Sequence, residues 1–192
     1  MTDKTVGYAI CGSFCTFSKT IPQIKKLVDS GVRVLPIMSQ NAYSTDTRFA
    51  KAEEFISEVE RITGEKIINT ISGAEPIGPK KMCDLIIVAP CTGNTLAKLA
   101  NGVTDTAVTM ALKSHLRIKR PVLLCIATND GLGASAQNIG RLINTKNIYF
   151  VPFSQDDPHN KPNSLVSDFE LIYPCAEKAL KNIQYQPVIK GS

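Results

Sequence analysis

The sequence predicts an α/β protein built on one doubly wound parallel sheet. Four largely apolar runs, at 5–12, 32–38, 85–89 and 120–128, are rich in β-branched residues and too short for buried helices. Turn residues follow these runs, and segments with helical spacing follow the turns. This is the repeating pattern of parallel strands joined by helices that cover both faces of a sheet.

Length and composition predict one cytoplasmic domain. At 192 residues, the chain is long enough for one core and short for two, so we expect a single domain over 1–192 with a flexible tail at 185–192. Hydrophobic residues at 43% and charged residues at 20% are ordinary for globular proteins. The N-terminus lacks the pattern of a secretory signal.

The distribution of charge argues against a nucleic-acid site, and the spacing of the cysteines argues against a metal site. The formal net charge is +5, but lysines and arginines are spread along the chain and no basic run is interleaved with aromatics, so we do not expect nucleic-acid binding. Six cysteines show no paired CxxC, and only two histidines are present to join them. We therefore expect reduced cysteines and no metal site.

The first predicted strand, 5–12, leads into a tight turn at Gly12 and Ser13. The helix after it has Pro22 in its first turn and ends at Gly31. The turn lacks the second and third glycines of GxGxxG, so it is not expected to admit a dinucleotide. A single phosphate suits Ser13 and the first N–H groups of the helix better. The alternative is a plain turn without a ligand.

The second predicted strand, 32–38, is expected beside the first, and Ser39 follows it directly. Ser39 either completes the same phosphate site or is only a helix N-cap. Beyond it, 48–62 has the spacing of an amphipathic helix, and 65–71 is predicted as a short edge strand. Glycines and prolines in 73–81 predict a surface linker.

The strongest functional signal follows the third predicted strand, 85–89. Pro90 ends this strand, and small or polar residues come next, namely Cys91, Thr92, Gly93, Asn94 and Thr95. Open α/β sheets bind ligands at this end of their strands. The alternative is an ordinary strand-to-helix turn with Thr92 or Asn94 as its N-cap.

The fourth predicted strand, 120–128, opens into the polar turn Asn129-Asp130-Gly131. The polar stretch 154–164 is either a lid over a site or a disordered surface loop. The remaining segments are a basic, solvated connector at 113–119, a helix at 134–143, a strand at 147–153 and a helix at 168–183.

The segment PCTGNTLAKLANGVTDTAVTMA resembles the PxSANTxAKxAxGxxDxL signature of flavoproteins related to the phosphopantothenoylcysteine and lantibiotic-cysteine decarboxylases. The resemblance implies a Rossmann-like, flavodoxin-like fold that binds FMN and assembles as a trimer or dodecamer. It also implies that Asp105 lies in the segment closing the site between subunits. The cofactor-binding residues that we expect are Gly12, Ser13, Phe14, Ser39, Pro90, Cys91, Thr92, Gly93, Asn94, Thr95, Asp105 and Thr128.

The sequence departs from the decarboxylases at two places. The decarboxylases carry a catalytic histidine in the segment that corresponds to 43–75, and this chain has no histidine there. Of their PxMNxxMW motif, only Asn129 remains in this chain. We expect Asn94 to bond ring or substrate oxygens and Asn129 to lie near substrate carboxylates, as the two candidate catalytic residues. Cys91 is better explained as a small packing residue than as a nucleophile.

The motifs GSF, MSQNA, PCTGNT and IATNDGLGASAQNIGRL resemble, along nearly the whole chain, a sporulation-linked branch of the same family. This resemblance implies a subunit that acts with an NAD(P)-binding partner subunit in the mother cell of a sporulating bacterium. Together they would oxidise a dihydrodipicolinate precursor to dipicolinate. Two alternatives remain: an FMN-dependent cysteine-type decarboxylase, and a scaffold subunit with a vestigial flavin pocket.

Overall fold

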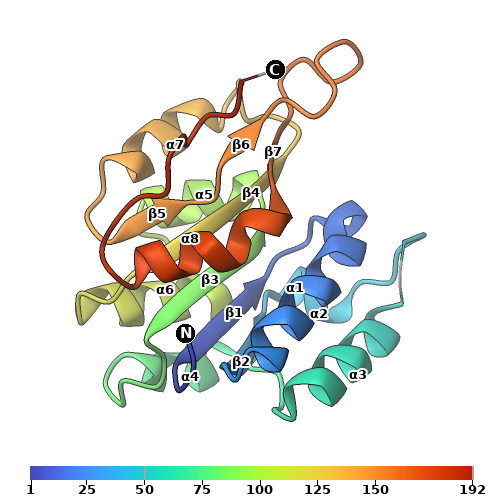
Figure 1. The fold of residues 1–192 in the computed structure, drawn as a ribbon. Helices are drawn as coiled ribbons and strands as arrows, with labels where there is room; N and C mark the ends of the chain where they lie inside the picture. Colours follow the sequence, from blue (N-terminus) through green and yellow to red (C-terminus); the bar gives the residue numbers. More distant parts are fainter. Residues whose placement is uncertain (50, 192) are drawn as a thin grey trace.

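The computed structural model describes residues 1–49 and 51–191 as three layers, with a sheet between two groups of helices (Figure 1). Five strands are parallel, in the order β2-β1-β3-β4-β5, as predicted for a doubly wound sheet. Their bounds are β1 Thr5–Ile10, β2 Arg33–Met38, β3 Leu85–Cys91, β4 Val122–Thr128 and β5 Ile148–Phe150.

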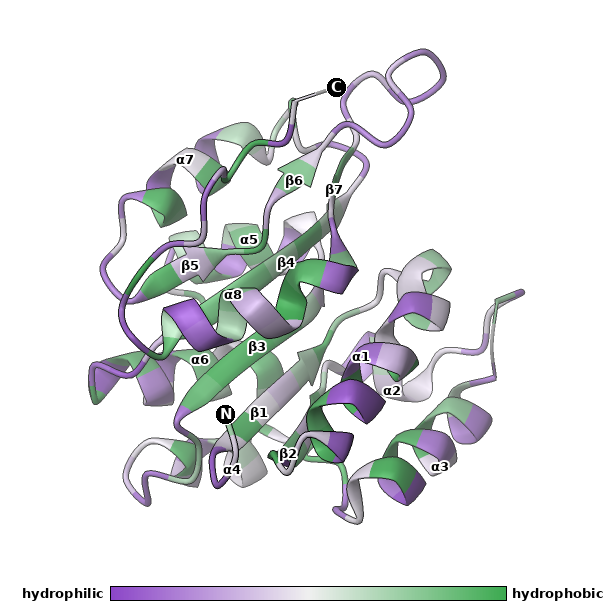
Figure 2. Ribbon diagram, viewed as in Figure 1, coloured by the Kyte–Doolittle hydropathy of each residue, from purple (hydrophilic) through white to green (hydrophobic). Residues whose placement is uncertain are grey.

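The strands are apolar because helices cover both faces of the sheet. Along β3, Leu85 and Ile87 belong to one core and Ile86 and Val88 to the other, and all four are fully buried. The first core packs on α1 (Phe17–Asp29), α2 (Gln40–Ser44), α3 (Ala52–Thr63) and α8 (Ile172–Ala179). The second packs on α4 (Ile71–Ala74), α5 (Gly93–Ala100), α6 (Ala107–Arg117) and α7 (Ala136–Ile143). Figure 2 shows the apolar residues concentrated in the sheet and on the inner faces of the helices.

An antiparallel extension at the end of β4 was not predicted. The expected strand at 147–153 divides into β5 and β6 (Phe153–Ser154), and β6 pairs with β7 (Leu165–Ser167). Strand β5 pairs with the first half of β4. Strand β7 pairs antiparallel with the last two residues of β4, Ala127 and Thr128. The loop between β6 and β7 is thereby held at the carboxyl end of the sheet.

Two predicted helix starts were wrong. Helix α1 begins at Phe17, so Pro22 lies inside the helix instead of in its first turn. Helix α3 begins only at Ala52, after an extended N-cap at Lys51. The predicted first turn from Arg48 is therefore not helical, and Ala50 lies outside the described residues.

Two segments predicted at the surface contribute to the core. The expected linker at 73–81 forms the end of α4 and the 3₁₀ turn η2 (Glu75–Ile77), with Ile77 fully buried. The expected connector at 113–119 is largely the end of α6. The Ser114 hydroxyl joins the two segments: it donates to the Glu75 carbonyl (2.6 Å) and accepts from the Gly78 N–H (2.8 Å).

Other predicted segments are shorter than expected. The edge strand at 65–71 is reduced to one bridge between Ile68 and Ile37, and the last helix ends at Ala179 instead of Ile183. Within the predicted flexible tail, Val188 and Lys190 form backbone hydrogen bonds with Phe153, while Ser192 lies outside the described residues. Among the described helices, none is long and apolar enough to cross a membrane.

Candidate functional site

The predicted site residues gather where the chain changes direction across the sheet. From β1 the chain turns to α1 on one face, and from its neighbour β3 it turns to α5 on the other. Such a switch point opens a crevice at the carboxyl ends of the strands. Two adjoining cavities lie there, of about 680 and 310 Å³, and Gly12, Phe14 and Thr92 line both.

The smaller cavity contains the predicted Ser39, Asn94 and Thr95. The Ser39 hydroxyl accepts a hydrogen bond from the Ala42 N–H (3.3 Å) and so caps α2. Ser39 therefore both caps α2 and lines the cavity, although the sequence left a cap and a binding residue as alternatives. Sequence reasoning missed Asn41 and Lys98, which line the same cavity.

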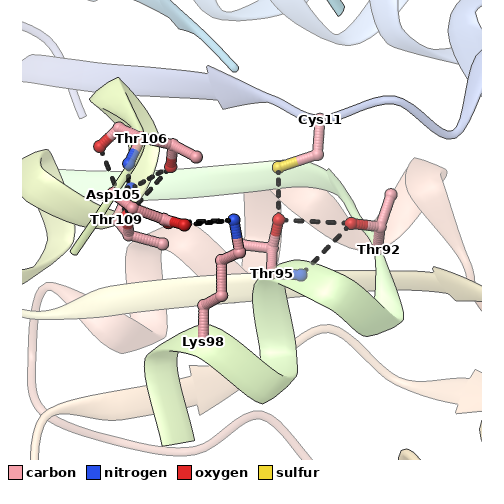
Figure 3. A network of polar contacts seen from close by, with 7 residues as sticks. All are labelled: Cys11, Thr92, Thr95, Lys98, Asp105, Thr106 and Thr109. Atoms are coloured by element: carbon pink, nitrogen blue, oxygen red, sulfur yellow. Dashed lines mark hydrogen bonds and ion pairs between the residues drawn. The ribbon is translucent and has the colours of Figure 1, made fainter. Parts of the chain in front are cut away.

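A chain of hydrogen bonds joins the β1 and β3 turns (Figure 3). The Thr92 hydroxyl accepts from the Thr95 N–H (3.3 Å), capping α5, and donates to the Thr95 hydroxyl (3.2 Å). That hydroxyl in turn donates to the Cys11 thiol (3.2 Å). Burial raises the pKa of Cys11 to about 11, against the opposing effect of the Thr95 hydrogen bond, so this thiol is neutral at physiological pH.

Asp105 lies beside the smaller cavity, not in its wall. Its carboxylate forms an ion pair with the Lys98 ammonium (2.9 Å), and the hydrogen bond from Lys98 lowers the pKa of Asp105 (Figure 3). Asp105 lines a separate cavity with Ile71 and Met110. Lys98 is therefore the bridge between Asp105 and the cavity that contains Ser39.

The larger cavity contains Ser13, Gly93, Thr128 and Asn129 of the predicted set. Asn94 and Asn129, the two candidate catalytic residues, are thus in different cavities that share a wall. Sequence reasoning missed most of the remaining lining residues, notably Lys19, Arg48, Phe49, Asp156 and Lys161. The last two belong to the 154–164 loop, the segment that was considered as a lid.

A polar cluster behind Gly93 was also missed. The Thr128 hydroxyl and the Ser135 hydroxyl (2.9 Å) both donate to the Asp130 carboxylate. A Cβ at position 93 would come within 2.6 Å of the Ser135 Oγ and 2.7 Å of the Thr128 Oγ1. Only glycine allows α5 to begin this close to the β4 turn.

Pro90 and Cys91 are buried and line neither cavity. Cys91 is fully buried in the core, and burial raises its pKa well above the ordinary value. A neutral, inaccessible thiol is a poor nucleophile. These observations favour the packing role.

Neither histidine replaces the missing catalytic one. His115 is buried near the amino end of β4, where its Nε2 is 3.0 Å from the Pro121 carbonyl oxygen; burial lowers its pKa to about 4. His159 is exposed in the 154–164 loop and lines neither cavity. Over 1–49 and 51–191, no cluster of three His, Cys, Asp or Glu side chains forms a metal site.

Comparison with known proteins gives consistent matches. The flavoprotein family model matches residues 1–164. The B subunit of dipicolinate synthase from Bacillus subtilis is 46% identical over 97% of this chain and 93% of its own length. The crystal structure of the dipicolinate synthase B subunit from Bacillus halodurans superposes with a TM-score of 0.91 at 44% identity, covering 100% of this chain and 98% of that one. Burkholderia xenovorans DmrB in complex with FMN shares the fold, with a TM-score of 0.70 at 17% identity over 93% of this chain and 96% of that one.

Proposed function

Because this chain belongs to the flavoprotein family, we propose that it is the flavoprotein-like subunit of a dipicolinate synthase. The observation that carries the proposal is the similarity over nearly the full length to the B subunits of this enzyme from two Bacillus species. The reaction is the two-electron oxidation of dihydrodipicolinate to dipicolinate in the mother cell during sporulation, or the same oxidation of its hydroxy-tetrahydro precursor accompanied by the loss of one water molecule. Its partner is an NAD(P)-binding subunit.

The residues in the two cavities fit the chemical groups of FMN. Together the cavities are in the size range of cofactor sites, roughly 300–1,000 Å³. The smaller offers donors for a phosphate and a sugar chain from Ser39, Asn41 and Lys98, and Phe14, which lines both cavities, offers its flat ring to an aromatic system. We therefore assign the phosphate to the smaller cavity and the flavin ring to the shared wall; Gly12 belongs to that wall, and Ser13 lines the larger cavity beside it.

Aromatising a dihydropyridine removes a hydride and a proton. When bound, FMN supplies an acceptor for the two electrons. The chain's own groups position the reactants: the Asn94 amide donates to ring or substrate oxygens, Asn129 donates to a substrate carboxylate, and Phe49 limits water access. The proton would be released to solvent, and the oxidised nicotinamide on the partner would supply the final acceptor for the two electrons.

The need for a partner follows from the β1 turn. GSFCTFS lacks the glycines that admit a pyrophosphate, so a nicotinamide dinucleotide is not expected on this chain. The proposed test combines the purified chain with its partner and NADP and follows dipicolinate by its ultraviolet absorbance. The decarboxylase alternative is disfavoured because neither histidine lies in the cavities.

The visible absorption spectrum of the purified protein distinguishes the scaffold alternative from the proposed function. A freshly purified protein that uses FMN has flavin absorbance in the visible range, or acquires it on addition of FMN followed by desalting. A chain that remains colourless after both treatments is a scaffold at most.

We also propose a homo-oligomer, a trimer or a dodecamer, with Asp105 near its interface. Exposed apolar residues lie on this side of the molecule: Val103 is 43% exposed and Ile71 41%. Apolar patches of this kind mark contacts between subunits. A monomer mass by light scattering at micromolar concentration would contradict both the assembly and a site shared between subunits.

A further inference from the structure

The larger cavity carries an excess of positive charge. Its charged lining residues are Lys19, Arg48, Lys161 and Asp156, three cations against one anion. They come from α1, from the segment before α3 and from the loop between β6 and β7, so they meet only in the folded chain. The smaller cavity has a single cation, Lys98, which Asp105 already pairs.

Two of the three cations are without an ion-pair partner within the described residues. Lys161 pairs with Asp156 (3.7 Å). Arg48 lies over the ring of Phe49, with its guanidinium carbon 4.8 Å from the centroid, and forms no ion pair with a described carboxylate. Lys19 influences Asp168, but that carboxylate forms its own ion pair with Lys190 (2.7 Å).

Aromatic side chains accompany these cations. Phe14 and Phe49 both line the cavity. Phe14 packs on the buried Phe17 (5.2 Å between ring centroids), which in turn stacks on Phe55 (4.3 Å). A planar ligand in this cavity therefore has the exposed ring of Phe49, on the segment before α3, to pack against, while the anchored ring of Phe14 belongs to the wall assigned to the flavin.

We propose that the larger cavity binds a planar aromatic dicarboxylate, with one carboxylate on Arg48 and the other on Lys19. This inference rests on the proposed function and deepens it, because it assigns substrate and product recognition to residues beyond Asn129. Two unpaired cations match the charge of a dianion, and a guanidinium binds a carboxylate through two parallel hydrogen bonds. A cofactor phosphate is also a dianion, so the experiment has to separate the two ligands.

Calorimetric titration of the full chain with dipicolinate is the first arm of the test. Arg48→Gln and Lys19→Gln should each weaken dipicolinate binding by about tenfold, the usual scale for one charge-assisted hydrogen bond. Lys25→Gln is the matched control, because it removes the same charge from an exposed position of α1 away from both cavities. Picolinate, with one carboxylate, should bind more weakly than dipicolinate and be affected by only one of the two substitutions.

FMN titration of the same variants is the second arm. Unchanged FMN affinity with weakened dipicolinate binding supports the assignment. Weakened FMN affinity with unchanged dipicolinate binding overturns it and assigns the cations to the cofactor phosphate. Equal dipicolinate affinity in wild type and both variants also overturns it.

Cys15 provides an independent readout of occupancy. It lines the larger cavity and is the exposed cysteine among six free ones, the other five being buried. Dipicolinate should slow alkylation of Cys15 by iodoacetamide in the wild type and have a smaller effect in Arg48→Gln. Alkylation at the same rate with saturating dipicolinate would place the ligand elsewhere. If dipicolinate binds as expected but the chain and its partner form no product, the proposed reaction fails while this binding site stands.

Discussion

The Thr95 hydroxyl donates a hydrogen bond to the Cys11 thiol at 3.2 Å, which joins the start of α5 to the end of β1. Thr95 is 6% exposed and Cys11 1% exposed, so water does not compete for this bond. Both side chains line the smaller cavity, with Thr92 and Asn94 next to them. The two turns proposed to hold FMN are thus fixed relative to one another before any ligand binds.

The Thr92 hydroxyl caps α5 next to the Thr95–Cys11 contact, so its removal should destabilise the protein. We expect Thr92→Ala to lower the free energy of unfolding by about 1 kcal/mol, because the Thr95 N–H loses its acceptor. Thr92→Ser keeps the hydroxyl and should restore most of the stability. Urea denaturation measures both variants, and equal losses in the two would show that the methyl group, not the cap, is responsible.

Glycine at position 93 should be required by the β4 turn. Gly93→Ala brings a Cβ within 2.6 Å of the Ser135 Oγ, and we expect a loss of about 1–3 kcal/mol together with weaker FMN binding. Gly140→Ala is the matched control in α7, since a Cβ there meets nothing within 4 Å. That substitution should stabilise the protein by up to about 1 kcal/mol. An equal change in thermal unfolding for Gly93→Ala and Gly140→Ala would contradict the close approach of α5 to the β4 turn.

Ser39 separates capping from ligand binding. Aspartate and asparagine both cap helices well, so Ser39→Asp and Ser39→Asn should preserve α2. Only the aspartate adds a negative charge to the smaller cavity, where it repels a phosphate. We expect FMN affinity to fall by about tenfold or more for Ser39→Asp and far less for Ser39→Asn. An unchanged dissociation constant for Ser39→Asp, measured by flavin fluorescence, would remove Ser39 from the site.

Stability should depend on pH through His115, away from the site. Burial lowers the pKa of His115 from 6.5 to about 4, so the unfolded chain takes up a proton at this position before the folded chain does. The stability that the neutral imidazole contributes is complete above pH 6.5 and is lost as the pH falls toward 4. His115→Gln should flatten this acid limb of the stability profile. His159→Gln, an exposed position, should leave it as steep as in the wild type.

The sequence predicted the parallel strands because their apolar runs are continuous, which happens only when both faces are covered. The start of α3 was misplaced because Phe49 fits the helical period of 48–62, although Phe49 is 52% exposed beside the larger cavity.

Family motifs identified the turn residues, but no motif indicates Lys19, Arg48 and Lys161. These three are far apart in the chain and meet only through the folding of α1, the segment before α3 and the β6–β7 loop. The Asp130 cluster was missed because Asn129-Asp130-Gly131 has an ordinary turn composition.

The separation of Asn94 from Asn129 also lies beyond sequence reasoning. Both follow the carboxyl ends of neighbouring strands, β3 and β4, and the sequence predicted only that Asn94 bonds ring or substrate oxygens and that Asn129 lies near substrate carboxylates. Gly12, Phe14 and Thr92 line both cavities, so the division between them depends on how these residues pack, which strand order does not specify.

Dipicolinate formation from purified components is the most direct test of the proposed function. We predict ultraviolet absorbance of dipicolinate only when this chain, its NAD(P)-binding partner, NADP and the precursor are combined, and little or none when either protein is omitted. Full activity of the partner without this chain, or turnover by this chain with NADP and no partner, would contradict the proposal.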